Sequence, residues 1–296
     1  MSGVMHTISV VKVDVGVENQ LTMSFTGLLK TPKMRQKFKE EFAKPSLGRQ
    51  LQLLVPPQAN DPQLVGTAFD YLLRFYIKQQ NPQAITQPWV AENVLDILRK
   101  NGSHSLYEQG HLALTQTKEY YAQFLKTGEM SKDLIRATLK MAKLDVVQRD
   151  KRIAKNIDDI EEEDVEDLSK LIGVVKPNTF KTSGVVVLNP TFGLIPILVG
   201  GADADIVIDD CLIDIKTVKK VSLERDYLNQ VIGYYLLSKI EGIDGVPSGY
   251  EIKKLGIYFS RCAELIVFPV EAVVDSQRLP QILEWFKAEL QRDLRN

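Results

Sequence analysis

The 296-residue sequence has few cysteines and histidines, which narrows the chemistry that it can support. Its two cysteines, Cys211 and Cys262, lie in or beside strand-like apolar runs and have no paired spacing with histidine. This argues against a disulfide framework or a zinc cluster. The three histidines, His6, His104 and His111, also lack the spacing of metal ligands. Any metal site must therefore depend on other residue types.

The sequence also lacks a membrane segment and a strong charge of either sign. No apolar run reaches the roughly 20 residues that span a bilayer, and the start, MSGVMHTISVV, lacks the layout of a signal peptide. We therefore expect a cytoplasmic protein with no membrane partner. The net charge is -1, so contact with a polyanion would depend on local positive patches. There is no G-x-S-x-G elbow, and Gly200-Gly201 lacks the full dinucleotide or P-loop pattern.

The composition, with 44% hydrophobic and 25% charged residues, is typical of a globular protein. The length fits about two domains or one elaborated α/β domain, and nothing indicates an oligomeric state. We divide the chain into an N-terminal arm or hairpin with a basic segment (1–61), a helical region (62–176) and an α/β core (177–296).

The first segment combines a weak strand pattern with a basic stretch, and the second has helical patterns. Weak alternation over Thr7–Leu29 predicts a hairpin or an arm, and the basic stretch at 30–50 predicts a short helix with loops. Apolar spacing over Pro62–Gln79 predicts a helix with one buried side, and several helices follow between Trp89 and Ile172. Their breaks are expected near Asn101-Gly102, Gly128 and residues 152–157. The acid-rich run Asp158–Ile172 predicts a solvated helix face that points away from any substrate.

A sheet is predicted after Pro177, because the chain changes to short apolar β-rich runs. Helical patterns at Leu223–Ile240 and Arg278–Leu294 interrupt and close this region. The order predicts an α/β fold with a mixed central sheet and helices on its faces. The runs are GVVVLNP, LIPILVGG, DIVIDD, CLIDIKT, KLGIYFS and ELIVFPV.

The stretch from Gly200 to Lys220 carries the residues with chemical potential. Two strands joined by Asp209-Asp210 predict a hairpin. Because strand side chains alternate, Asp214 and Lys216 share one face of the second strand. Asp203 and Asp205 likewise share a face before the first strand, whereas Ile215 points the opposite way.

Two interpretations of this hairpin stay open from the two strands alone. Carboxylates and a lysine at the edge of an apolar sheet are costly to bury unless they are paired or bind a cation, and oxygen ligands favour magnesium or manganese. Alternatively, the charges face water or form a salt bridge. The next helix favours a site, because Gln230 and Tyr234 lie one turn apart on a helix that can pack beside the strand.

Four short motifs occur in a fixed order along the chain: Gly66–Asp70, Gly201–Asp205, Asp214–Thr217 and Gln230–Tyr234. A strand at Ile257–Arg261 follows them. In this order the motifs resemble those of the PD-(D/E)XK nucleases, in particular the RecB-like exonuclease branch with its pattern G-T-x-x-H, G-x-x-D, D-x-K and Q-x-x-x-Y. The resemblance covers mainly residues 177–269, together with the helix around the first motif.

The resemblance implies a fold and an activity. The fold is a restriction-endonuclease-like core, with a mixed central sheet flanked by helices and a helical insertion. The activity is that of a metal-dependent phosphodiesterase, a nuclease that uses Mg²⁺, with Mn²⁺ as a substitute, on nucleic acid and preferably on DNA. The alternative is a catalytically silent domain of the same fold that binds nucleic acid or a protein partner.

The resemblance also implies ligands and a catalytic lysine. Asp205 and Asp214 would hold one or two magnesium ions, with the backbone carbonyl of Ile215 as a further ligand. We prefer Asp205 to Asp203 because it directly precedes its strand, as the metal-binding aspartate of the family does. Lys216 would orient or deprotonate the attacking water, or stabilise the negative transition state.

The remaining residues have supporting roles in this hypothesis. Gln230 and Tyr234 would position the catalytic lysine and contact the scissile phosphate or a neighbouring base. Asp70 stands where the branch usually has a metal-binding histidine, and it is either a ligand or an ordinary polar residue. Lys219 and Lys220 would contact phosphates or simply face solvent.

Overall fold

The computed structural model describes residues 24–100, 104–150, 156–193 and 202–293. In these ranges the protein is an α/β protein with a mixed, open six-stranded sheet and nine α-helices, seven of which precede the second strand in the chain. The helices are α1 (Phe25–Leu29), α2 (Pro32–Glu41), α3 (Pro62–Gln80), α4 (Val90–Lys100), α5 (His104–Thr127), α6 (Lys132–Asp150), α7 (Glu162–Gly173), α9 (Arg225–Glu241) and α10 (Leu279–Asp293). The strands are β1 (Ile85–Thr86), β2 (Val186–Leu188), β3 (Ile206–Ile208), β4 (Cys211–Lys216), β5 (Lys254–Phe259) and β6 (Glu264–Pro269).

The six strands lie side by side in the order of the sequence. β2, β3 and β4 form an antiparallel meander, and β5 and β6 form a second antiparallel pair. β1 pairs with β2, and β4 with β5, in parallel. A parallel pair needs a crossover, and α9 supplies it between β4 and β5. The predicted hairpin and mixed strand directions are therefore confirmed.

The helical predictions agree closely with the structure after residue 30. α2 lies in the basic segment, α3 matches the helix expected at Pro62–Gln79, and α4 to α7 fill the region between Trp89 and Ile172. Asp61 caps α3, accepting hydrogen bonds from the backbone N–H groups of Gln63 and Leu64 at 3.1 and 2.9 Å. α9 and α10 follow the two expected C-terminal patterns. The two-residue strand β1 was not predicted, and the apolar run LIPILVGG lies outside the described residues.

The end of the expected N-terminal hairpin is helical, so the strand prediction is wrong there. Ser24 caps α1 by accepting a hydrogen bond from the backbone N–H of Gly27 at 3.2 Å. The side chains of Phe25 and Leu29 would lie only 3.0 and 2.8 Å from a Cβ at Gly233. The apolar residues of this segment thus serve a short helix that packs against α9. Residues 7–23 lie outside the described ranges.

The acidic segment at the start of α7 is only partly solvated, which corrects the expected acidic face. Asp164 and Asp167 are buried. Asp164 accepts a hydrogen bond from the backbone N–H of Asp61 at 3.0 Å. Asp167 forms a two-contact ion pair with Arg261, at 2.9 and 2.7 Å. These two acids join α7 to the segment before α3 and to the turn after β5.

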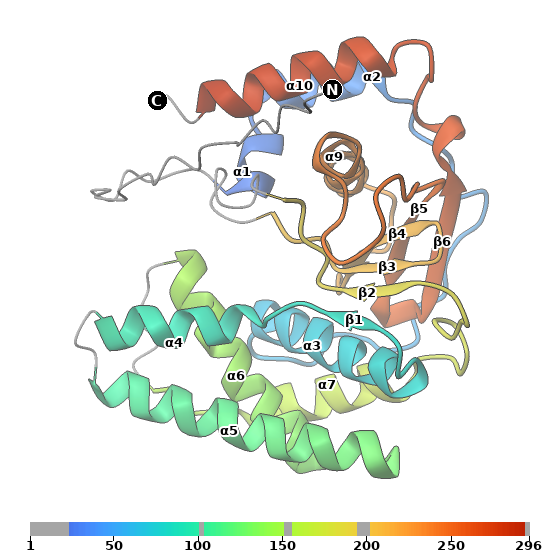
Figure 1. The fold of residues 1–296 in the computed structure, drawn as a ribbon. Helices are drawn as coiled ribbons and strands as arrows, with labels where there is room; N and C mark the ends of the chain where they lie inside the picture. The colour runs from blue at the N-terminus through green and yellow to red at the C-terminus, as the bar shows by residue number, and fades with distance from the viewer. Residues whose placement is uncertain (1–23, 101–103, 151–155, 194–201, 294–296) are drawn as a thin grey trace, which may run out of the picture.

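Helices cover both faces of the sheet, giving a three-layer arrangement (Figure 1). Residues of α3 to α7 form one apolar core with Ile213 and Ile215 of β4. Residues of α1, α2, α9 and α10 form a second core with Leu212, on the opposite face of the same strand. None of the described helices is both long and apolar enough to cross a membrane. The helical region therefore packs directly onto one face of the α/β core.

Candidate active site

The candidate site lies at the C-terminal end of β4, where this strand outruns its hairpin partner. β3 begins at Ile206, opposite Ile213, whereas β4 continues to Lys216. The last residues of β4 therefore pair only with β5 among the described strands. The missing stretch of β3 leaves a gap in the sheet where α3 and α9 approach from opposite faces.

A cleft of about 270 Å³ occupies this gap and brings all four motifs together. The first motif contributes one face of α3, and the second contributes the carboxylate before β3. The third motif contributes the end of β4, and the fourth contributes a glutamine of α9. Residues more than a hundred positions apart in the sequence thus share one cavity. Its lining is Pro62, Gln63, Gly66, Thr67, Asp70, Asp205, Asp214, Ile215, Lys216, Thr217 and Gln230.

Beyond the start of β3, the side chain of Asp205 makes the hydrogen bond to β4 that a neighbouring strand would otherwise make. Its Oδ2 accepts a hydrogen bond from the backbone N–H of Ile215 at 2.6 Å. In a β-strand the N–H and C=O of one residue point to the same side. The carbonyl of Ile215 therefore faces the side on which Asp205 lies, past the start of β3. A carboxylate and a backbone carbonyl thus meet at this edge.

Lys216 lies between a carboxylate of its own strand, β4, and an amide and a ring of α9. Its Nζ lies 2.6 Å from Oδ2 of Asp214 and donates a hydrogen bond to Oε1 of Gln230 at 2.9 Å. The ammonium also lies 5.3 Å from the centre of the Tyr227 ring. Gln230 in turn donates to the hydroxyl of Tyr234 at 3.3 Å. The structure therefore forms the chain from acid to lysine, glutamine and tyrosine that the spacing suggested.

Asp214 is buried in the cleft with incomplete hydrogen bonding. Its side chain is 1% exposed, and its Oδ1 has no hydrogen-bond partner within the part of the chain that the structure describes. A buried, unpaired carboxylate oxygen carries a large desolvation cost. Lys216 offsets this cost at Oδ2 only. The second oxygen remains available to a cation or to water.

Burial, together with the neighbouring charges, raises the pKa values of Asp205 and Asp214. Burial, strengthened by Asp214 and Asp70, raises the pKa of Asp205 well above its usual range. Burial also raises the pKa of Asp214, although Lys216 acts in the opposite direction. Burial alone would lower the pKa of Lys216, but the two aspartates outweigh it and the net shift is upward. Ionisation of both aspartates in the metal-free site therefore costs free energy, because one lysine does not compensate for their burial.

Asp70 lies in the cleft and is paired with Arg74 one helical turn later. Oδ2 of Asp70 and a guanidinium nitrogen of Arg74 are 2.5 Å apart, and Oδ1 has no hydrogen-bond partner among the described residues. The guanidinium stacks on Tyr71, 4.5 Å from the ring centre. We did not predict Arg74, although its spacing from Asp70 is that of a helical ion pair and could have indicated it.

The arrangement fits a magnesium ion with an incomplete protein shell. No three His, Cys, Asp or Glu side chains of the described residues form a ready-made ligand group. Mg²⁺ usually takes one or two carboxylates and keeps several waters or phosphate oxygens. Asp205, Asp214 and the carbonyl of Ile215 provide such a partial set, and the unpaired Oδ1 of Asp214 suits it. Asp70 is a further oxygen donor only if it moves away from Arg74.

The other predicted residues lie outside the cleft lining. Lys219 and Lys220 are exposed in the loop after β4. Asp203 is half-buried just before β3 and acts electrostatically on Tyr234, on the α9 side of the sheet. Gly201 of the second motif lies outside the described residues. Thr217 lines the cleft as the last residue of the third motif, and Gln63 lines it although no motif included it.

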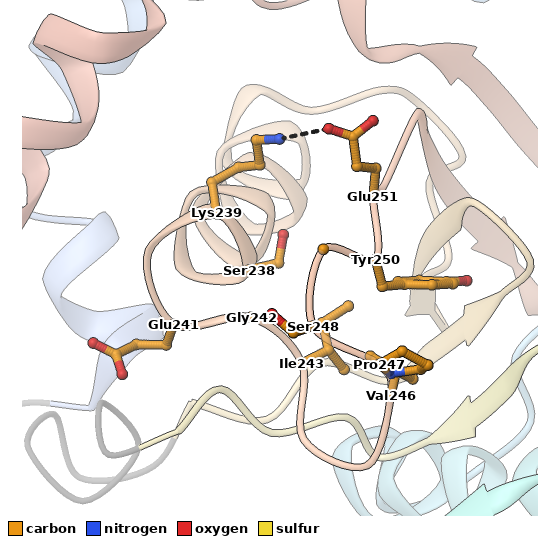
Figure 2. Close-up of a pocket in the computed structure, with 11 residues that line it drawn as sticks. Ser238, Lys239, Glu241, Gly242, Ile243, Val246, Pro247, Ser248, Tyr250 and Glu251 are labelled. Carbon is orange, nitrogen blue, oxygen red and sulfur yellow. Dashed lines mark ion pairs between the residues drawn. The ribbon is translucent and has the colours of Figure 1, made fainter. Parts of the chain in front are cut away.

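A larger hollow of about 490 Å³ lies elsewhere, under the loop between α9 and β5 (Figure 2). Lys239 and Glu251 face each other across it at 3.6 Å, and the Tyr250 ring extends away from Lys239. Most of its walls are exposed loop residues, including Gly242 and Pro247. It gathers no group of buried, unpaired acids comparable to the β4 cleft.

Comparisons with protein-family models, curated proteins and solved structures find no match to this chain. The chemistry of the cleft must therefore be argued from its own residues. Its defining features are a buried aspartate, Asp214, the half-buried Asp205, a lysine paired with Asp214, and a glutamine and tyrosine behind the lysine.

Proposed function

We propose that the protein is a metal-dependent nuclease with its active site in the β4 cleft. The proposal includes a restriction-endonuclease-like core made of β2 to β6 with α3 and α9, and membership of the PD-(D/E)XK superfamily in its RecB-like branch. The observation that carries it is the convergence of Asp205, Asp214, Lys216 and Gln230 from separate elements on one cleft. A salt bridge with a purely structural role would not need the surplus carboxylates.

The residues have roles that follow from their positions. Asp205, Asp214 and the Ile215 carbonyl would hold Mg²⁺, or Mn²⁺ in its place. A bound divalent ion supplies charge neutralisation at the phosphoryl oxygens and lowers the pKa of a water ligand. Lys216 donates to the attacking water or to the phosphoryl oxygens, and its raised pKa keeps it protonated at neutral pH. The roles open to the lysine are to orient or deprotonate the attacking water, or to stabilise the negative transition state.

Gln230 keeps the lysine aimed at the cleft. It accepts the lysine's hydrogen bond and is itself oriented by the buried hydroxyl of Tyr234. Positioning of this kind contributes to catalysis because the reacting geometry must be held closely. Lys219 and Lys220, exposed beyond β4, would contact phosphates farther along the strand.

The size of the cleft supports a polymeric substrate. Pockets that enclose whole small molecules usually measure about 300–1,000 Å³. A cleft of about 270 Å³ fits one segment of a longer chain. Carboxylates that hold a divalent cation suit a phosphodiester, and DNA is our preferred substrate.

The test is cleavage by the purified protein. Single- and double-stranded DNA and RNA would be incubated with Mg²⁺, Mn²⁺ or a chelator, alongside Asp214→Asn and Lys216→Ala. We expect metal-dependent cleavage by the wild type, lowered by about 10²–10³-fold in either variant because transition-state charge loses its partner.

Two outcomes would count against the proposal. A wild type inert on every substrate would leave the silent binding domain as the better interpretation, and retained binding of oligonucleotides would support that alternative. Variants that cleave as fast as the wild type would place the activity elsewhere or in a contaminant. Asp210→Asn is the matched control, because Asp210 pairs with Lys254 in the exposed β3–β4 turn, far from the cleft lining.

A further inference from the structure

Gly66 is a glycine that the fold itself does not require. It lies inside α3 and lines the cleft. Among the described residues outside its own helix, a Cβ at this position would meet one atom within 4 Å, the Cβ of Thr217 at 3.7 Å. This is an ordinary van der Waals distance, so an alanine fits. Packing of the free protein therefore leaves the absence of a side chain unexplained.

A glycine here also costs stability. Glycine inside a helix is less favourable than alanine, because it loses more backbone freedom on folding. Gly110 and Gly233 differ, since a Cβ at either would lie 2.8 Å from a leucine side chain. A Cβ at Gly66 would instead make only the ordinary contact with Thr217, on the wall of the cleft. A stability cost with no packing benefit indicates a contact made by something that the free protein lacks.

The neighbours of Gly66 form one face of the helix along the cleft. Gln63, Gly66, Thr67 and Asp70 are spaced by three and four residues and all line it. The same cleft contains Asp214, which is buried with its Oδ1 unpartnered among the described residues. The bare helix surface and the unpaired carboxylate thus face a common space.

We propose that the sugar–phosphate chain of the substrate lies against this face of α3, in van der Waals contact with the backbone of Gly66. This inference rests on the proposed nuclease function and adds the path of the strand. α3 is then the wall that sets how deeply the scissile phosphodiester enters toward the end of β4. The exposed amide of Gln63 lies at the outer end of this path and can donate to a phosphate oxygen.

The test compares Gly66→Ala and Gly66→Leu with the wild type in thermal unfolding and in cleavage of a labelled oligonucleotide. Alanine should raise Tm by roughly 2 °C, because helix propensity improves without a clash. It should nevertheless lower kcat/KM about tenfold, and leucine about 10²-fold, because the strand is displaced from its reacting position. Kd for the same oligonucleotide in chelator should rise in the same order.

Gly173→Ala is the control, since Gly173 is the last residue of α7, does not line the cleft, and a Cβ there would meet nothing within 4 Å. It should leave kcat/KM and Kd unchanged. Wild-type kcat/KM in Gly66→Leu would overturn the strand path while leaving the nuclease proposal intact. A lower Tm in Gly66→Ala would overturn the premise that the fold tolerates a side chain. A wild type that cleaves nothing would remove the proposed function, and this inference with it.

Discussion

Two buried aspartate–cation pairs in this protein are built very differently. Asp167 is fully enclosed and receives two hydrogen bonds from Arg261, which also donates to the carbonyl of Val55 at 3.3 Å. Asp214 is equally buried, but Lys216 meets only one of its oxygens, and the charge of Asp214 helps to raise the pKa of a second carboxylate, Asp205. The first pair is complete, and the second is not.

The difference distinguishes a pair that holds the fold from one that is prepared for a ligand. A buried ion pair repays its desolvation only when its geometry is good and its remaining polar atoms are satisfied. The Arg261 pair meets that condition and ties α7 to the turn after β5. The Lys216 pair does not meet it, because Oδ1 of Asp214 has no hydrogen-bond partner among the described residues. The experiments below test this distinction, from the largest expected effect to the smallest.

Breaking the complete pair should damage the fold and leave the chemistry intact. We expect Asp167→Ala to lower the free energy of unfolding by about 3–5 kcal/mol, because it leaves Arg261 buried without a counter-ion. Denaturant unfolding would measure the loss. Activity per folded molecule should stay at the wild-type value below the transition. A small stability change would show that Arg261 finds solvent or another partner.

Adding a divalent ion should stabilise the protein through the incomplete pair. At a Mg²⁺ concentration one hundred times Kd, binding to the folded state alone contributes about 2.7 kcal/mol. Tm should therefore rise with Mg²⁺, and a chelator should reverse the rise. Asp214→Asn should abolish the response, whereas Asp167→Asn should keep it from a lower starting Tm. An identical response in Asp214→Asn would place the ion elsewhere.

Removing the support behind Lys216 should lower turnover more than binding. Gln230→Ala takes away the hydrogen bond that aims the lysine, and loss of such a support typically costs about 10–100-fold. We expect the loss in kcat, with KM nearly unchanged, in steady-state cleavage assays. Tyr234→Phe, which removes only the more distant hydroxyl, should lose less. If Tyr234→Phe lowered kcat more than Gln230→Ala, the proposed order of support, from Tyr234 through Gln230 to Lys216, would be wrong.

Neutralising the surplus acid should stabilise the metal-free protein in a pH-dependent way. Because the pKa of Asp205 is raised in the folded state, its ionisation costs stability above the ordinary carboxyl range of about 4. Asp205→Asn keeps an oxygen to accept from Ile215 and removes the charge. Its Tm in chelator should exceed that of the wild type near pH 8, and the difference should shrink toward pH 4. A difference independent of pH would indicate a packing effect.

The sequence allowed the framework to be predicted where patterns are long and local. Apolar spacing located α3, α9 and α10 because each extends over several turns. The Asp209-Asp210 hairpin and the alternation along β4 placed Asp214 and Lys216 on one face. Helical spacing placed Gln230 and Tyr234 on one face of their helix, and the family resemblance placed that face beside the lysine. These features depend on near neighbours in the chain.

Short or long-range features escaped prediction for physical reasons. β1 has only two residues, too few to show a period, and it exists because β2 offers it a partner. α1 is a five-residue helix stabilised mainly by packing on Gly233. The burial of Asp167 could not be inferred because Arg261 lies 94 positions away. In the sequence of the acidic segment, the acid that pairs with a distant arginine looks like its solvent-exposed neighbours.

The chain order of the cleft has a consequence for how the protein folds. Asp205 to Tyr234 form a continuous stretch through β3, β4 and α9, so the reactive half of the cleft depends on contacts of short sequence separation. The α3 wall must dock from far upstream, which carries a larger loop-closure cost. We expect the hairpin and α9 to form first and α3 to dock later. Amide hydrogen exchange should then find α3 opening more readily than β4, so that the width of the cleft is governed by the layer that docks last.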